Sequence, residues 1–240
     1  MKDAHLHLTD KRIRPEEVIA SAKLKGVDGF LSCSANPDEW QTLKALLKSH
    51  SEVIGFFGVH PWYVNDISNN WQVTLESLLK ENPKAGVGEI GLDKIKPDYE
   101  KQKGMFVEQL ELAIKYKRIA TIHSVKAHED VLAILKQYKK SLPPLVLHSY
   151  SAPVSFIKPF AELGCYFSIS PFILKKDEKD AAELLLSIPE DRLLIETDAP
   201  DGLKSPELLS EFIMHLADIM GREYTKLENI VTANLERLIK

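Results

Sequence analysis

Short apolar runs alternate with longer amphipathic stretches along the whole chain. Eight of the runs have the length and composition of buried strands, at residues 3–8, 27–34, 53–59, 84–91, 118–124, 144–150, 164–170 and 192–198. Stretches with apolar residues at helical spacing separate them, among them residues 15–26, 37–50, 72–83, 98–118 and 128–140, and they often start at proline, aspartate or serine. The pattern therefore predicts repeated strand–helix units.

Eight such units within 240 residues favour an α/β fold of the TIM-like (β/α)8 barrel type. The chain has no linker rich in proline, glycine or serine, no low-complexity tract and no sequence repeat. We therefore expect a single domain over residues 1–240. An open, doubly wound parallel sheet is the structural alternative, because it uses the same order of elements.

Net charge, cysteine positions and the length of the apolar runs exclude some classes of protein. A net charge of -4 argues against a protein that coats nucleic acid by bulk electrostatics, so any nucleic-acid contact should be local. Cys33 and Cys165 both lie in apolar runs, which predicts buried free thiols and a reducing compartment. Without a signal sequence or a run long enough to span a bilayer, we expect a cytoplasmic chain, monomeric and without an obligate protein partner.

Ionisable residues gather at the carboxyl ends of the predicted strands, which is where a barrel of this type carries its active site. These residues are His5, His7, His60, Glu89, His123, His148 and Asp198. The other three histidines, His50, His128 and His215, fall on predicted helices or their edges and are expected at the surface.

A divalent cation explains why apolar strands end in ionisable groups that converge on one mouth, since unpaired buried charge is costly. Imidazoles with carboxylates suit Zn, Mn, Co or Fe, and Mg is not excluded. Six ligands are too many for one tetrahedral zinc, whereas two ions that share a bridging carboxylate would use them all. The simpler alternative is that each histidine only bonds a neighbouring loop, which the joint placement disfavours.

The same motifs resemble the TatD-type metal-dependent hydrolases, deoxyribonuclease-like members of the amidohydrolase superfamily. The resemblance runs nearly end to end, through DAHLHL, GVHP, GVGEIGLD, the helix from Gln102 to Leu110, IHS, LHSY, LLIETDAP and NLERL. It implies a distorted barrel with the following roles: His5 and His7 bind one metal, His123 and His148 bind the other, Glu89 bridges the two, Asp198 completes the site and His60 holds the scissile phosphate. Spacing alone does not separate His60 from the ligands.

The first functional hypothesis is a metal-dependent phosphodiesterase that cleaves DNA from an end. Two divalent ions (Mg, Mn or Zn) would activate a water molecule, with Glu89 and Asp198 as the catalytic carboxylates and Asp198 as the proton acceptor. The alternative is a metal-dependent hydrolase of a small ester, lactone, amide or phosphoester, because the same chemistry attacks a carbonyl. A noncatalytic barrel is disfavoured, since every matching ligand position is filled.

Loop sequences bear on substrate rather than on metal. The stretches SYSAP after His148, SVKA after His123 and DGLKSPELL after Asp198 depart from the usual pattern of the family, so the resemblance extends to the metal chemistry more than to the substrate. Four loop lysines could contact flanking phosphates or be ordinary solvated residues, namely Lys94, Lys96, Lys126 and Lys204. Trp62 and Tyr63 could stack on a terminal base or simply pack their loop.

Four further features have structural interpretations. Asp3 and Asp93 could each bond the second nitrogen of a ligating histidine or stabilise a turn. Glu196 shares a strand face with Asp198 and is predicted to be a buried partner. Gly86, Gly88 and Gly91 predict close backbone packing around Glu89, because the stretch lacks the ending of a phosphate-binding loop.

Overall fold

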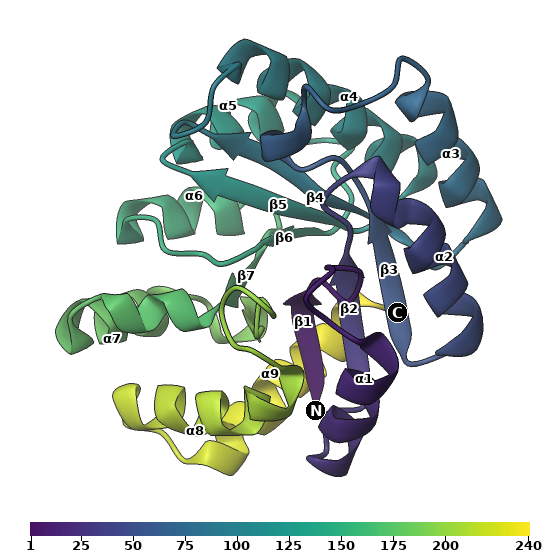
Figure 1. The fold of residues 1–240 in the computed structure, drawn as a ribbon. Helices are drawn as coiled ribbons and strands as arrows, with labels where there is room; N and C mark the ends of the chain where they lie inside the picture. Colours follow the sequence, from purple (N-terminus) through teal and green to yellow (C-terminus); the bar gives the residue numbers. More distant parts are fainter.

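A computed structural model describes residues 1–240 (Figure 1). Eight parallel strands form one sheet in the order of the sequence, and it curls into a barrel ringed by helices, which confirms the predicted fold over the open-sheet alternative. The strands are β1 (Lys2–Leu6), β2 (Gly29–Cys33), β3 (Val53–Phe57), β4 (Gly86–Asp93), β5 (Ala120–Val125), β6 (Leu145–Leu147), β7 (Tyr166–Ile169) and β8 (Leu193–Ile195).

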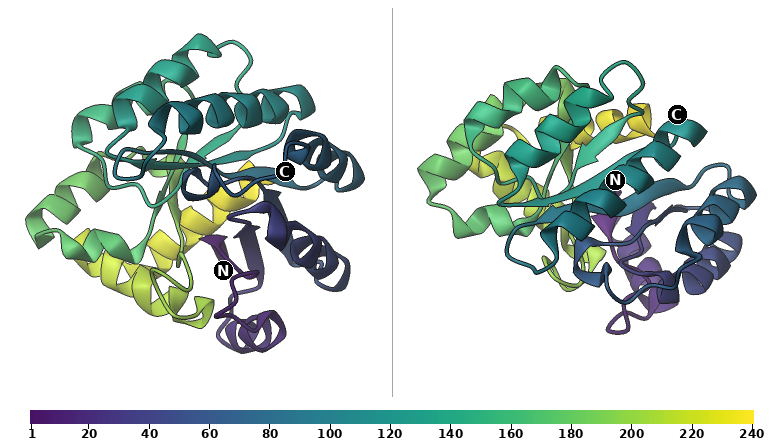
Figure 2. Two further views of the ribbon diagram at one scale, coloured as in Figure 1. Left: turned by 45° about the horizontal axis from the view of Figure 1, so that its top comes forward. Right: turned by 90° about the horizontal axis from the view of Figure 1, so that it is seen from above.

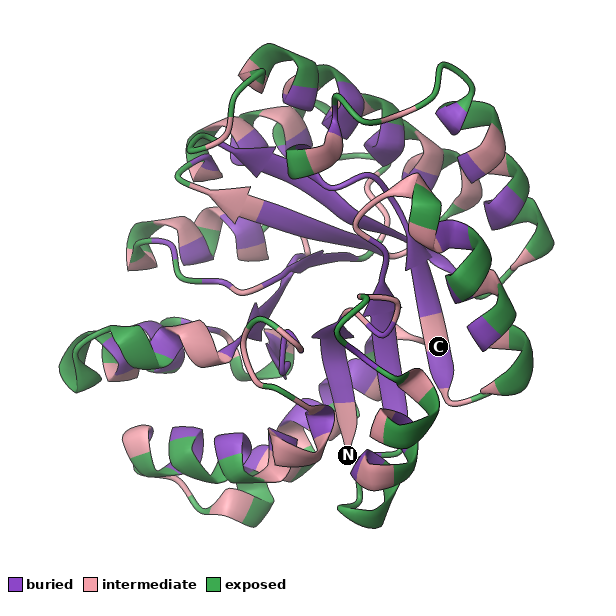
Figure 3. Ribbon diagram, viewed as in Figure 1, coloured by how far each residue is buried: buried purple, intermediate pink, exposed green.

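The helices connect successive strands on the outside of the barrel, as expected for right-handed βαβ units. They are α1 (Pro15–Leu24), α2 (Trp40–Ser49), α3 (Trp71–Glu81), α4 (Tyr99–Tyr116), α5 (His128–Gln137), α6 (Ile157–Ala161), α7 (Glu178–Ser187), α8 (Leu209–Ile219) and α9 (Tyr224–Leu238). Figure 3 shows buried residues along the strands and on the inner faces of the helices, with exposed residues on the outer faces. The apolar faces of the amphipathic helices thus pack against the sheet and form one main core between helices and sheet.

The barrel closes between β8 and β1 mainly at its carboxyl end. Parallel ladders join β1 to β8 in order, and the last gap is bridged where Asp198 N donates to His5 O at 3.0 Å and His7 N donates to Ala199 O at 2.8 Å. The buried carboxylate of Asp3 strengthens this seam, because it accepts from Thr197 N at 2.9 Å and also bonds the Thr197 hydroxyl. The seam therefore fixes His5 and Asp198 side by side.

The interior of the barrel has its own small core, which α9 closes from below. This core joins Ala4, Leu31, Cys33, Phe56, Val146, Tyr166 and Leu194 of the strands to Leu235 and Leu238 of α9. Asn234 of α9 also donates to the carbonyl of Leu193 at 2.8 Å. Figure 2 shows α9, in yellow, against the strands in both views. The barrel is therefore filled at its amino end.

Smaller predictions concern the cysteines, the helices and the three histidines outside the cluster. Cys33 and Cys165 are buried free thiols, as predicted. Among the helices, none has the length and apolar character needed to cross a membrane. Of the three histidines expected at the surface, His215 is exposed, and His50 and His128 are partly exposed. His50 is partly buried beside Glu52, and His128 is packed near Phe156 while its ring bonds the Ser124 hydroxyl at 2.8 Å.

Phe167→Ala should lower the free energy of unfolding by about 3–5 kcal/mol, because this ring is fully buried in the main core and its loss leaves a cavity. Equilibrium denaturation in urea measures the effect. Leu24→Ala is the control: Leu24 is 89% exposed, so its truncation should change stability by no more than about 0.5 kcal/mol. Equal effects of the two substitutions would contradict the assignment of the core.

Candidate metal centre

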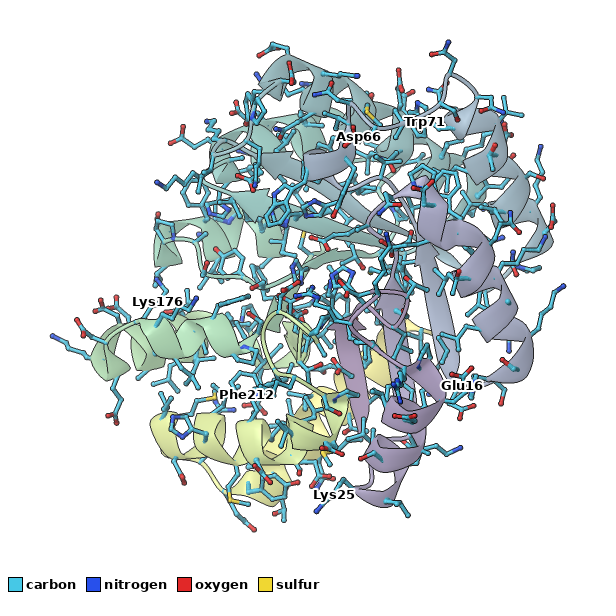
Figure 4. The ribbon with its side chains drawn as sticks, viewed as in Figure 1. Glu16, Lys25, Asp66, Trp71, Lys176 and Phe212 are labelled. Carbon is cyan, nitrogen blue, oxygen red and sulfur yellow. The ribbon has the colours of Figure 1, made fainter.

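The polar strand-end residues meet in one cavity at the carboxyl end of the barrel. The cavity has a volume of about 580 Å³, and its lining includes His7, His60, Glu89, His123, His148 and Asp198. His5 lies directly beneath, fully buried. Figure 4 shows nitrogen-bearing side chains crowded near the centre of the molecule. The structure thus brings together all seven residues that the sequence singled out.

Glu89 of β4 lies at the centre of this cluster, and its two oxygens face different groups of nitrogens. Oε2 lies 3.3 Å from Nε2 of His5 and 3.4 Å from Nε2 of His7. Oε1 faces three more nitrogens, at 2.8 Å from His123 Nδ1, 3.2 Å from His60 Nε2 and 3.5 Å from His148 Nε2. This is the arrangement expected of a carboxylate placed between two cation sites.

Asp198 completes the group around Oε2 of Glu89. Its Oδ1 lies 3.9 Å from His5 Nε2 and 3.7 Å from His7 Nε2, and those two nitrogens are themselves only 3.2 Å apart. Glu89 belongs to two groups of donor atoms that are close enough to share an ion, one with His5 and His7 and one with His60 and His123. A third group consists of His5, His148 and Asp198. His148 thus lies between the two predicted sites.

Neighbouring acceptors indicate which ring nitrogen of each histidine is free to bind a cation. His7 Nδ1 is 3.1 Å from the carbonyl oxygen of Cys33, which can only accept, so we assign the proton to Nδ1 and the lone pair to Nε2. In His123, Nε2 lies 3.4 Å from Asp93 Oδ2 and Nδ1 lies 2.8 Å from Glu89 Oε1, so Nδ1 is the atom that a cation beside Glu89 would meet. Such outer partners are typical of metal-ligating histidines.

Glu196 plays the corresponding part for His148. Its Oε1 lies 2.7 Å from His148 Nδ1 and also accepts from Ser149 N at 2.8 Å, so Nε2 is the nitrogen of His148 that faces the cavity and Glu89. Glu196 is fully buried, as its alternation with Asp198 predicts. Its second oxygen has no hydrogen-bond partner in the protein.

His60 shows the opposite pattern. Its Nδ1 accepts a hydrogen bond from the backbone N–H of Trp62 at 3.2 Å, so the neutral ring carries its proton on Nε2, the nitrogen that points into the cavity. A ring in this tautomer donates a hydrogen bond rather than a lone pair. Its distance to Glu89 is similar to those of the predicted ligands, so the tautomer and not the distance sets His60 apart.

Burial and neighbouring charges set the pKa values of the cluster. Burial lowers the pKa of both His5 and His60 to about 4, so both rings are neutral near neutral pH. Burial raises the pKa of Asp198 to about 6. For His148, burial favours the neutral ring, but the charges of Glu196 and Glu89 outweigh it and raise the pKa to about 10. A cation bound at His148 would take the place of that proton.

The donor set fits divalent cations. Imidazole nitrogens that face inward, together with buried carboxylates, are the ligands that Zn, Mn, Co or Fe prefer, and the carboxylates are also compatible with Mg. Burial opposes the charge of Glu89, yet the imidazoles of His148, His60 and His123 hold its pKa well below the usual range. The cluster is thus built to keep a negative charge at its centre, which a cation needs.

Two glutamines of α4 that the sequence analysis left without a role hold the loops of the site. Gln109 accepts from Val59 N at 2.7 Å and donates to Val59 O at 3.1 Å, next to His60. Gln102 accepts from Asp93 N at 2.8 Å and donates to Asp93 O at 3.1 Å. The signal in the sequence was two amides on the otherwise apolar face of an amphipathic helix.

Asp93 combines both of its predicted roles, because it contacts His123 and its Oδ1 also accepts from Ile95 N at 2.9 Å in a turn. Asp3 instead bonds the seam and the backbone N–H of His5. The glycines of β4 pack closely, as predicted: a Cβ added at Gly91, where φ is +146°, would lie 2.0 Å from the carbonyl oxygen of His123. Backbone contact at this point sets the distance between β4 and β5.

A barrel with imidazole and carboxylate donors gathered at the carboxyl ends of its strands is the arrangement expected of a metal-dependent hydrolase. The family model described as "TatD related DNase" matches residues 2–240, so the chain belongs to the TatD family. The prediction of a metal-dependent hydrolase related to the TatD deoxyribonucleases is thereby confirmed.

Individual relatives agree over the full length. The 3'-5' ssDNA/RNA exonuclease TatD of Escherichia coli is 32% identical over 261 residues, which cover 99% of this chain and 98% of that protein. The protein of the same name from Klebsiella pneumoniae is 29% identical over 257 residues, with 99% and 97% covered. A crystal structure of a TatD homologue from Escherichia coli superimposes with a TM-score of 0.90 at 23% identity, covering 99% of this chain and 97% of that one, and supports the fold.

Glu89→Gln should weaken the binding of divalent cations by at least ~100-fold, more than the ~10- to 100-fold typical of a lost outer partner, because the amide removes the charge between the two nitrogen groups. Isothermal titration of the metal-free protein with Mn²⁺ or Zn²⁺ measures it. Glu183→Gln, at an exposed position of α7, is the matched control and should bind like the wild type. Unchanged affinity in Glu89→Gln would rule out a central role for this carboxylate.

Proposed function

We propose that this chain is a divalent-metal-dependent exonuclease that removes nucleotides from the end of a single strand of DNA or RNA. The observation that carries the proposal is the placement of Glu89, whose two oxygens face two sets of histidine nitrogens beneath an open mouth. Relatives named 3'-5' ssDNA/RNA exonuclease support the same substrate class and direction.

Two cations would be held by this chain, one by His5, His7 and Asp198 and one by His123 and His148, with Glu89 between them. When bound, such ions lower the pKa of a water molecule and neutralise phosphate oxygens. We take Mg, Mn or Zn as the candidates, because the donor set suits each of them. Spacing within the cluster favours two ions over one.

The protein groups then have separate tasks. Asp198 Oδ1 faces the space between the histidines and can accept the proton of the attacking water. His60 points its Nε2–H into the same cavity and can donate to a non-bridging phosphate oxygen, which positions the scissile group. Glu196 and Asp93 keep the imidazoles of His148 and His123 turned toward the centre.

The shape and charge of the mouth favour cleavage at an end. The barrel is filled below by α9, so the cavity is blind and a chain must enter it by its terminus. Asp10, Glu39 and Asp201 line the rim, and Arg12 is neutralised there by ion pairs with Asp10 and Asp201, both at 2.8 Å. The negative charge of this rim repels the phosphates of a long nucleic-acid segment. A strand that contacts the rim only with its end brings fewer phosphates near it and is repelled less.

The acidic rim also keeps the alternative open, a hydrolase of a small ester, lactone, amide or phosphoester. Two of the loop lysines contact other side chains of the protein: Lys94 forms an ion pair with Asp130 at 2.7 Å, and the ammonium group of Lys96 lies over the Trp62 ring. A monomeric catalytic domain spanning residues 1–240, working in the cytoplasm without an obligate partner, completes the proposal. Size-exclusion chromatography with light scattering tests the oligomeric state.

With Mg²⁺ or Mn²⁺ present, a single-stranded oligonucleotide labelled at its 5' end should be shortened stepwise from its 3' end. Asp198→Asn should reduce kcat by ~100- to 10,000-fold, the range expected for loss of a proton-accepting group. Gel electrophoresis of timed samples gives the ladder and the rate. Asp180→Asn, exposed on α7, serves as control. If oligonucleotides stay intact while a small ester or phosphoester is hydrolysed, the alternative is correct.

A further inference from the structure

Two aromatic rings, each with a lysine over it, stand on opposite sides of the cavity mouth. Trp62 follows β3 and Phe172 follows β7, strands that lie across the barrel from one another (Figure 1). Both rings line the cavity. The ammonium nitrogen of Lys96 lies 4.1 Å from the centre of the Trp62 ring, and that of Lys175 lies 4.3 Å from the centre of the Phe172 ring.

Trp62 is held rigidly although its side chain is exposed. The residue is 51% exposed, but its indole Nε1 donates to the buried Asp93 Oδ2 at 2.7 Å. Its ring stands edge-on to that of His60, with centroids 5.1 Å apart and planes at 87°. A large apolar side chain fixed beside the predicted phosphate-binding residue, and left open to solvent, is expected where a ligand covers it.

Phe172 is positioned by the short 3-10 helix η4 (Pro171–Lys175). Ser170 caps this helix, because its hydroxyl accepts from Phe172 N at 3.4 Å. The ring is half-buried, so one part packs on the loop while another faces the cavity. Both aromatic residues therefore sit in short 3-10 turns, each begun by a side chain that caps the turn.

The two lysines retain free charge. No carboxylate lies within ion-pairing distance of Lys96 or Lys175, in contrast to Lys94 and Arg12. Each ammonium group is held over an aromatic ring by a cation–π contact. An unneutralised cation beside an open aromatic surface matches a nucleotide, in which a phosphate lies next to a base.

We infer that a single strand lies across the mouth between these two pairs, with the base beside the scissile phosphate on Trp62 and a base further along the strand on Phe172. The order follows from the phosphate contact proposed for His60, because its ring stands beside that of Trp62. The lysines meet the phosphates next to each base. This inference rests on the proposed nuclease function, and it selects unpaired strands because bases in a duplex are already stacked.

Fluorescence tests the Trp62 contact directly, since the other two tryptophans, Trp40 and Trp71, are buried. The probe is a decathymidylate with phosphorothioate linkages, titrated into wild type with Mg²⁺. It should quench the emission of wild type, and Trp62→Leu should remove most of that quenching and raise Kd by ~5- to 100-fold. Trp62→Phe keeps an aromatic face and should regain most of the affinity, which excludes a folding defect as the cause.

Matched controls lie next to the two lysines in sequence. Ile95→Ala and Leu174→Ala change exposed side chains that do not line the cavity, and both should bind the probe like wild type. Phe172→Leu should weaken binding by a similar ~5- to 100-fold. Lys96→Ala and Lys175→Ala should each reduce the slope of log Kd against log salt by about one unit or less.

A double-mutant cycle separates stacking from other effects. Removing the terminal base of the probe and replacing Trp62 by Leu should be non-additive, because either change abolishes the same contact. Additive losses, or full affinity in both Trp62→Leu and Phe172→Leu, would overturn the inference while leaving the nuclease proposal intact. Failure of wild type to bind any single strand would instead overturn the proposed function itself.

Discussion

The site depends on one buried carboxylate that must keep its charge. Glu89 is nearly inaccessible to water, and five imidazole nitrogens surround its two oxygens at 2.8 to 3.5 Å. A charge this deep is costly unless positive or partly positive groups surround it. The barrel meets this requirement by ending five strands near the same point, and the tight glycine contacts of β4 allow the carboxylate to reach it.

Partners outside the cluster decide what each imidazole offers. Where the outer neighbour is an acceptor, such as the carbonyl of Cys33 or the carboxylate of Glu196, it holds one ring nitrogen so that the other faces the cavity. Where the outer neighbour is a donor, as at His60, the inner nitrogen carries hydrogen. One residue type thus presents two kinds of nitrogen to the cavity, and the difference arises from the backbone and carboxylate groups that contact the outer side of each ring.

The sequence was sufficient for the strands and for the residues at their ends, because apolar runs and strand direction are local properties. Alternation along one strand was also enough to find Glu196. It could not separate His60 from the ligands, since that depends on the orientation of the Trp62 N–H. The roles of Gln109 and Arg12 depend on partners far away in sequence, in other loops, and the burial of His128 depends on packing near Phe156.

The seam between the first and last strands has a consequence for folding of the protein. Asp3 and Thr197, which join it, are 194 positions apart, and the inner core needs Leu235 and Leu238 of the final helix. Contacts this distant form late in folding. Before the segment at Thr197 reaches Asp3, the backbone hydrogen bonds that hold His5 and Asp198 side by side are absent. Assembly of the candidate metal centre therefore belongs to the last part of folding, because it needs residues from both ends of the chain.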